Sequence, residues 1–311
     1  WIVTAHKAFS SKEWMKVTIN DVVYEITVTD NQNPATSLPA AVDGKIILTE
    51  DVELSDGWKS ISGTYILDLA GYGIRLDGST ISLTSGGNLT LMDSNPSSEH
   101  YITLNSDGRG TSVSDTQPSG TEGTDYIKVT GGYITGGGTD GIDGSVYVAG
   151  NSTLKMTGGT ICGNRAKYAG GVYIKGSGTF EMTGGKIIYN TQISNDSGAG
   201  GVCKSYSTGT FKMYGGEIRY NKGNYSGGVN AAVTFQVKGT PVISNNTKGD
   251  VESNVLFHKI AGNYAPKKIE VVDVLQEGAN ICVTPENDPI AVKSGERSTD
   301  LTEAEVVSLV H

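Results

Sequence analysis

The chain has 311 residues, of which 37% are hydrophobic and 18% are charged, and its net charge at pH 7 is −9. This composition excludes a charge-rich disordered chain, and no apolar run reaches the length of about 18 residues that a membrane-spanning helix needs. We therefore expect no membrane insertion, and we expect no binding to nucleic acid, whose charge is also negative.

The first segment, residues 1–34, precedes the repeats described below. "SSKEWMKVTI" is expected to hold a short amphipathic turn and "VVYEITVTD" a strand. We predict that this segment is an N-terminal cap, because an uncovered strand edge pairs with other chains. The sequence begins at Trp1 rather than at Met, so we also expect it to be a piece of a larger protein.

From residue 44 onward, short segments alternate apolar and polar residues, which is the period of a β-strand. Three early segments, "KIILTEDVEL", "YILDLAGYGI" and "GNLTLMDS", follow this pattern. Their apolar side chains are expected to face inward: Ile46, Leu48, Leu67, Leu69, Leu89 and Leu91. A polar stretch rich in Gly and Ser follows, and we predict a mobile inserted loop at about residues 95–124. Insertions in a solenoid tend to gather on its functional face.

A twelve-residue pattern then recurs. "YIKVTGGYITGG", "TLKMTGGTICGN", "TFEMTGGKIIYN", "TFKMYGGEIRYN" and "TFQVKGTPVISN" start at residues 126, 153, 179, 210 and 234. Aligned apolar residues form four columns, which are Ile127, Leu154, Phe180, Phe211 and Phe235; Val129, Met156, Met182, Met213 and Val237; Ile134, Ile161, Ile187, Ile218 and Val242; and Val146, Val172, Val202 and Val229. Three short strands per repeat exclude a helical solenoid.

The repeat therefore predicts an all-β fold, a right-handed parallel β-helix over residues 35–250 with about eight coils between residues 44 and 250. One polar column is expected to form a ladder of hydrogen-bonded amides inside a turn: Asn164, Asn190, Asn221 and Asn245. After residue 250 the repeat fades. Residues 251–311 are expected to form irregular closing strands and a short helix that starts near Thr302, with Glu305 completing a capping box.

The turns carry the candidates for catalysis. Asp140 and Asp143 precede one strand, and Asp196 occupies the equivalent turn two coils later. Two carboxyls can hydrolyse a glycoside, whereas a lyase needs a base such as Lys167 or Lys204 beside carboxylates that hold Ca²⁺. Apart from Ca²⁺ in that lyase case, no metal or cofactor is expected. Asp beside Gly is also ordinary turn chemistry.

Outward-facing tyrosines are the candidates for ligand binding: Tyr147, Tyr168, Tyr173, Tyr189, Tyr220 and Tyr225. Tyr147 and Tyr173 are expected to stack on successive coils, and so are Tyr189 and Tyr220. Flat rings spaced along a rigid rod suit the faces of sugars. Tyrosine is also a common residue on the face of a sheet, so a purely structural role stays open.

The segment "GGTICGNRAKYAGGVYIKGSGTFEMTGGKIIYN" resembles the repeats of large surface proteins of Gram-positive gut bacteria, which belong to the pectin-lyase-like right-handed β-helix superfamily. This resemblance covers residues 44–283 and implies export, display on the bacterial cell surface and a place within a multidomain adhesin. The superfamily also contains pectate lyases and polygalacturonases, but their catalytic clusters do not map onto this sequence.

We therefore expect a secreted or cell-surface module that binds a polysaccharide or a host glycan surface without cleaving it. The first alternative is a glycoside hydrolase or polysaccharide lyase that uses the turn carboxylates. The second is a rigid stalk that binds no ligand.

Overall fold

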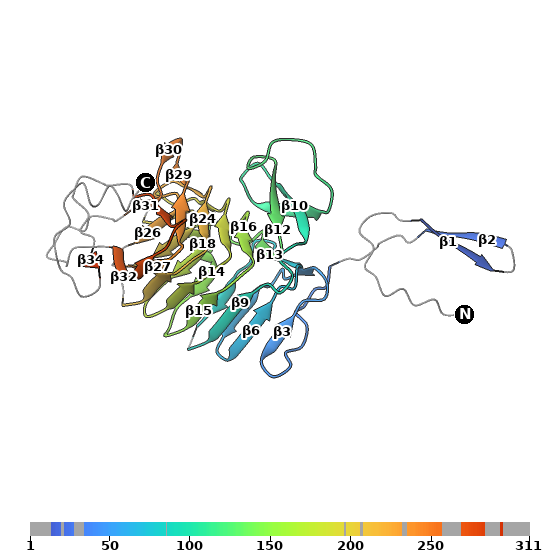
Figure 1. Cartoon of the computed structure of the whole chain (residues 1–311), viewed down its shortest axis with the longest axis horizontal. Coiled ribbons are helices and arrows are strands. Elements are labelled where there is room, and N and C mark those ends of the chain that lie inside the picture. The colour runs from blue at the N-terminus through green and yellow to red at the C-terminus, as the bar shows by residue number, and fades with distance from the viewer. Residues whose placement is uncertain are drawn as a thin grey trace.

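The computed structural model describes residues 14–19, 22–27, 34–84, 86–195, 197–205, 208–231, 235–256, 269–283 and 293–294. These residues form an all-β structure, and no helix occurs among them (Figure 1). In particular, the described residues contain no helix long and apolar enough to cross a membrane. The short helix expected near Thr302 lies outside the described residues.

Three long parallel sheets, here called the rod, form the body of the structure. Sheet 1 consists, in hydrogen-bonded order, of β3 (Lys45–Ile47), β6 (Thr64–Asp68), β9 (Asn88–Met92), β15 (Thr153–Met156), β19 (Thr179–Met182), β23 (Thr210–Met213), β27 (Phe235–Gly239), β32 (Ile269–Leu275) and β34 (Lys293–Ser294). Sheet 2 consists of β4 (Val52–Glu53), β7 (Gly73–Arg75), β13 (Tyr133–Thr135), β16 (Thr160–Cys162), β20 (Lys186–Ile188), β24 (Glu217–Arg219), β28 (Val242–Ser244) and β33 (Asn280–Ile281). Sheet 3 consists of β5 (Trp58–Ile61), β8 (Ile81–Leu83), β14 (Gly144–Val148), β18 (Ala169–Ile174), β22 (Val202–Lys204), β26 (Val229–Ala231) and β31 (Val255–Leu256).

The chain visits these sheets in turn, so that each strand pairs in register with the strand one coil later. This progression is typical of a parallel β-helix and confirms the predicted parallel stacking. From β17 onward each coil adds a short strand between sheets 2 and 3, and these parallel strands form sheet 4: β17 (Arg165–Ala166), β21 (Thr191–Gln192), β25 (Lys222–Gly223) and β29 (Thr247–Lys248). A fifth strand, β30 (Val251–Glu252), pairs antiparallel with β29 at the end of this sheet. Near the N-terminus, β1 (Trp14–Ile19) and β2 (Val22–Thr27) pair as an antiparallel hairpin.

The apolar columns meet in one continuous core. Leu154 pairs directly with Phe180, and Phe180 with Phe211. The rings of Phe180 and Phe211 lie 5.4 Å apart at an angle of 11°, and the ring of Phe235 follows at 5.4 Å from Phe211. All four side chains are at most 1% exposed. Burial of this kind contributes about 1.5–3 kcal/mol per large apolar side chain, so the stack is a principal source of stability.

The expected placement of Ile127 and Val129 in the first two columns is wrong. Both residues lie in β12 (Tyr126–Thr130), which pairs antiparallel with β10 (Glu99–Leu104) outside the rod. Leu154 of β15 pairs instead with Leu89 of β9. Among the described residues between 44 and 250, sheet 1 therefore has seven strands (β3, β6, β9, β15, β19, β23 and β27) where about eight coils were expected.

A second error comes from one extra residue in the turn before β28. Ile243, and not Val242, pairs with Ile218 and continues the third column. The amide ladder shifts by the same single residue. It continues from Asn221 to Asn246, whose side chain is fully buried, whereas Asn245 is exposed.

The amide ladder connects successive coils at the turn between sheets 2 and 4. The Nδ2 atom of each asparagine donates to the Oδ1 atom of the next, at 2.9 Å from Asn164 to Asn190, 3.0 Å from Asn190 to Asn221 and 2.9 Å from Asn221 to Asn246. Asn246 in turn donates from its Nδ2 atom to the Oδ1 atom of Asn254 at 3.0 Å. Every rung is buried, so the ladder fixes the direction of the chain where it leaves sheet 2.

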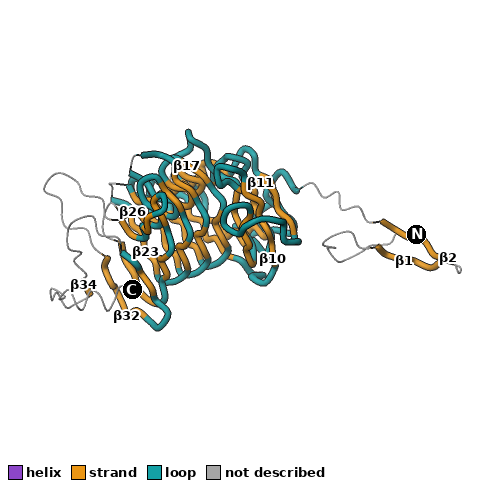
Figure 2. The backbone as a smooth tube through the Cα atoms, turned by 90° about the horizontal axis from the view of Figure 1, so that it is seen from above, coloured by secondary structure: helices purple, strands orange, loops and turns teal. Residues whose placement is uncertain are grey.

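The inserted segment contains an antiparallel sheet of three strands where a loop was expected. This inserted sheet has the order β11 (Gly110–Ser114), β10, β12 and stands out from the side of the rod (Figures 1 and 2). Its apolar side chains Ile102 and Ile127 pack in one cluster with Cys162 and Ile188 on the outer face of sheet 2. The backbone N–H of Gly110 also donates to the carbonyl oxygen of Gly163 in the rod at 2.8 Å.

Candidate ligand-binding site

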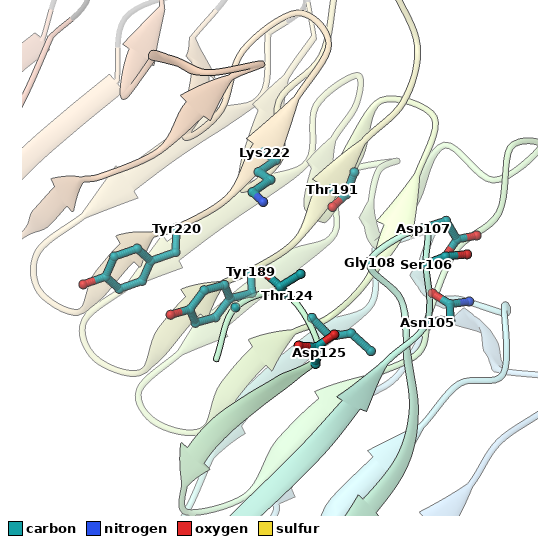
Figure 3. A pocket seen from close by; sticks show the side chains of 12 residues that line it. Asn105, Ser106, Asp107, Gly108, Thr124, Asp125, Tyr189, Thr191, Tyr220 and Lys222 are labelled. Carbon is teal, nitrogen blue, oxygen red and sulfur yellow. The ribbon is translucent and has the colours of Figure 1, made fainter. Parts of the chain in front are cut away.

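A pocket of about 510 Å³ lies where the inserted sheet meets the rod; it is called the insertion pocket below (Figure 3). One wall comes from the inserted segment, from residues 104–108 between β10 and β11 and from residues 123–125 before β12. The other wall belongs to the rod and consists of Tyr189, Thr191, Tyr220 and Lys222. Volumes of about 300–1,000 Å³ are usual for small-molecule sites.

The two tyrosines occupy a position where the coil requires left-handed backbone. Tyr189 and Tyr220 follow β20 and β24, directly before a ladder asparagine, with φ of 53° and 57°. Two earlier coils place Gly136 and Gly163 at this position, and the next coil places Asn245, all with positive φ. Glycine adopts this conformation freely, whereas another residue costs about 1–2 kcal/mol. Strained residues of this kind cluster at functional sites.

The rings of Tyr189 and Tyr220 stack, as expected, with centroids 5.1 Å apart and planes at 14°. Figure 3 shows them side by side at the edge of the pocket. Tyr220 is 38% exposed, and the guanidinium of Arg219 lies 5.0 Å from its ring centroid. Tyr189 is half-buried. Its burial, with the nearby carboxylate of Glu122 as a further cause, raises its pKa to about 12.

A row of polar side chains runs beside the tyrosines along sheet 4. In successive coils Arg165 pairs with Thr191, Thr191 with Lys222, and Lys222 with Thr247. Gln192, one residue beyond Thr191, is fully buried, so the row faces outward by strand alternation. Lys222 is exposed, and within the described part of the chain its ammonium group forms no ion pair.

Two carboxylates of the inserted segment complete the pocket. An oxygen of Asp107 lies 3.8 Å from Nε of Arg165, which also pairs with Asp140 on the rod. Asp125 is exposed, and one of its oxygens accepts a hydrogen bond from the backbone N–H of Thr121 at 2.7 Å. Sequence reasoning did not identify Asp107, Asp125 or Lys222. Lys222 could have been found, because it follows a ladder asparagine in the same way as Thr191 and Arg165.

The expected catalytic residues do not gather at this pocket. Asp140 is 77% exposed and paired with Arg165, while Asp143 lies 3.7 Å from Nζ of Lys175. Asp196 lies outside the described residues. The ammonium group of Lys167 lies 4.8 Å from the ring centroid of Tyr168.

Lys204 faces the interior of the rod. It is 1% exposed in β22, where it pairs with Ile174 on one side and Ala231 on the other, and its Nζ donates to the carbonyl oxygen of Ser205 at 2.8 Å. Burial lowers its pKa to about 8. An inward position in the core separates Lys204 from the turn carboxylates on the outside.

The remaining tyrosines lie away from the pocket. The ring of Tyr173 lies 5.8 Å from that of Tyr147 and 5.5 Å from that of Tyr168, in a small cluster on the outer face of sheet 3. Tyr173 is only 7% exposed, so neighbouring side chains cover the ring face on which a sugar would stack. Tyr225 lies beneath the ammonium group of Lys248, 5.6 Å from it.

The described residues contain no group of three His, Cys, Asp or Glu side chains placed to hold a metal ion.

Comparison of this chain with protein-family models, with characterised proteins and with solved structures finds no match.

Proposed function

We propose that this chain is a module of a secreted or cell-surface bacterial protein, and that it binds a polysaccharide or host glycan in the insertion pocket without cleaving it. The observation that carries the proposal is the stacked pair of Tyr189 and Tyr220, held in strained backbone at a pocket of suitable size. A purely structural role would be met at lower cost by glycine or asparagine, which other coils use at this position.

The surrounding groups match the chemistry of a sugar. The apolar face of a pyranose ring packs well on a tyrosine ring, and its hydroxyls need nearby donors and acceptors. Asp125 supplies carboxylate oxygens, and Lys222 supplies an ammonium group. Asn105, on the same wall as Asp107, already uses its Oδ1 to accept from the backbone N–H of Arg109, which leaves its amide N–H groups to donate.

We propose further that the coil is right-handed and belongs to the pectin-lyase-like superfamily, in agreement with the resemblance of the repeats. On this proposal the rod positions the pocket within a larger surface protein. The function as a rigid spacer is then compatible with glycan binding, because the two use different parts of the molecule.

Binding is tested with the whole chain against a panel of plant and mucin oligosaccharides by calorimetry. Tyr220→Asn should weaken the affinity about two- to twelvefold, since stacking on an aromatic ring is worth about 0.5–1.5 kcal/mol. Tyr147→Ala, on the outer face of sheet 3, is the matched control and should bind like the unmodified chain. Equal affinity of Tyr220→Asn and the unmodified chain would contradict the proposed site.

A second candidate function rests on the two carboxylates that line the pocket. Asp107 and Asp125 come from different loops, and a pair of carboxyls can cleave a glycosidic bond. The same panel is therefore assayed for new reducing ends. Product that disappears in Asp125→Asn would favour a glycoside hydrolase at this pocket, and product that persists there would point to the turn carboxylates Asp140 and Asp196.

A further inference from the structure

We propose that the insertion pocket takes the free end of a linear, uncharged glycan, about two or three rings long and aligned with the rod. This inference rests on the proposed glycan-binding function and specifies the class of ligand. Four features of the structure support it: the spacing of the binding groups, a loop that closes one end of the row, the end of sheet 4 beyond the other, and the balance of charge.

The binding groups repeat at the spacing of the coils. Thr191, Lys222 and Thr247 stand in one row of sheet 4, and Tyr189 and Tyr220 stand beside that row in the same coils. Strands in a sheet are about 4.8 Å apart, which is close to the length of one pyranose ring. Each coil can therefore present one set of groups to one ring, with the ligand lying along the row.

The inserted segment closes one end of the row. Gly108 lies so near Thr191 that a Cβ atom on Gly108 would stand 3.2 Å from Oγ1 of Thr191. The carboxylate of Asp107 covers Arg165, the next residue of the row, from a distance of 3.8 Å. A ligand chain that follows the row cannot continue past Arg165 without displacing this loop.

The hairpin of β29 and β30 stands at the other end of the row. Thr247 pairs antiparallel with Glu252, and Lys248 with Val251, so the parallel stacking of coils stops here and β30 is the last strand of sheet 4. Figure 1 shows this hairpin and the inserted sheet rising from the same side of the rod. The row from Thr191 to Thr247 spans two coil rises, or about 10 Å, which accommodates two or three rings, and a longer ligand chain continues past β30.

The charges in the pocket nearly cancel. Arg165 pairs with Asp107 and Asp140, and Arg219 pairs with Glu217. The carboxylates of Asp125 and Glu122 and the ammonium group of Lys222 remain exposed, so the surroundings of the pocket hold no excess of cations. A site for an acidic sugar would offer an excess of cations, as anion sites generally do. The balance here favours hydroxyl groups as the ligand's polar contacts.

The experiment measures affinity as a function of ligand length. Oligomers of N-acetylglucosamine, xylose and galactose with one to six units are titrated into the whole chain, together with a galacturonate hexamer as the acidic probe. We expect the affinity to rise up to two or three units and then to change less than twofold up to six. We also expect a bulky aromatic label to abolish binding at one end of the oligomer and to be tolerated at the other.

Variants locate the subsites. Thr247→Ala should remove the gain in affinity from two units to three, while Thr179→Ala, an equivalent change on sheet 1, should leave it intact. Affinity that keeps rising to six units, equal tolerance of labels at both ends, or tighter binding of galacturonate would overturn this inference and leave glycan binding itself standing. Failure of every neutral and acidic oligomer to bind would overturn the proposed function, and this inference with it.

Discussion

Tyr189 and Tyr220 stack 5.1 Å apart, one coil apart along the rod, although each has the left-handed backbone that bulky residues seldom adopt. The coil demands this backbone because the following asparagine must turn inward to join the amide ladder. The fold thus sets the conformation, and the choice of tyrosine adds an aromatic surface at the edge of a pocket. The aromatic surface and the strained backbone therefore belong to the same two residues.

Replacing Tyr220 by asparagine separates these two effects. The change relieves strain of about 1–2 kcal/mol and loses ring stacking of about 0.5–1.5 kcal/mol. We expect the free energy of unfolding, measured in urea, to change by less than about 1 kcal/mol. Phe211→Ala, in the core stack, should instead cost about 3–5 kcal/mol. A loss in Tyr220→Asn as large as that in Phe211→Ala would show that the tyrosine pair is needed for folding.

The regular coils could be predicted from sequence because their signal is local and repeated. Leu154, Phe180 and Phe211 each stand in a strand followed by a paired glycine, so aligning the turns also aligns the core. The prediction fails at β12, where "YIKVTGG" has the same local pattern but pairs with β10. The local pattern identifies a strand and the turn after it, whereas the partner of that strand depends on distant residues.

The pocket could be predicted only in part for the same reason. The stacking of Tyr189 and Tyr220 follows from the repeat, but Asp107 and Asp125 lie in an insertion that has no repeat to align. The shift from Asn245 to Asn246 shows how sensitive such columns are. One additional residue in a turn moves every later residue to the opposite side of the strand.

The amide ladder should be a major contributor to stability. Asn190 makes hydrogen bonds to Asn164, Asn221 and the carbonyl oxygen of Ile161, all of them buried. Asn190→Ala leaves several of these groups without partners, at about 1–3 kcal/mol for each. We expect a loss of at least about 3 kcal/mol in the free energy of unfolding. Asn245→Gly, which keeps the left-handed backbone of this exposed neighbour of the ladder, is the control, and a comparable loss there would contradict this assignment.

Lys204 should make stability depend on pH in the alkaline range. Its pKa in the folded chain is lowered to about 8 by burial, below the ordinary value of 10.5, so the unfolded chain binds more protons between these two values. Stability from this group therefore rises as the pH increases from about 8 to about 10.5. Lys204→Met should raise the free energy of unfolding at pH 7.5, on the order of 2–3 kcal/mol, and this gain should shrink by pH 10.

The measurement compares urea unfolding of Lys204→Met and the unmodified chain at both pH values, so that the titration of tyrosines affects both equally. Lys155→Met provides the control, because Lys155 lies on the outer face of sheet 1 with 47% of its side chain exposed. Its effect on stability should be similar at pH 7.5 and at pH 10. A gain from Lys204→Met that stays constant with pH would refute the titration of Lys204 in this range.

The contact between the inserted segment and Tyr189 can be tested by substituting two glycines whose backbone φ angles are nearly equal. Gly123 has φ of 82°, and a Cβ atom there would come 2.8 Å from Cε1 of Tyr189, whereas Gly86 has φ of 83° and open space around it. Alanine at either position carries the same backbone cost of about 1–2 kcal/mol. Only Gly123→Ala should displace the Tyr189 ring toward solvent, and the pKa of Tyr189 should then fall from about 12, as followed by NMR of labelled tyrosine. An unchanged Tyr189 pKa in Gly123→Ala would mean that the inserted segment does not form this wall of the pocket in solution.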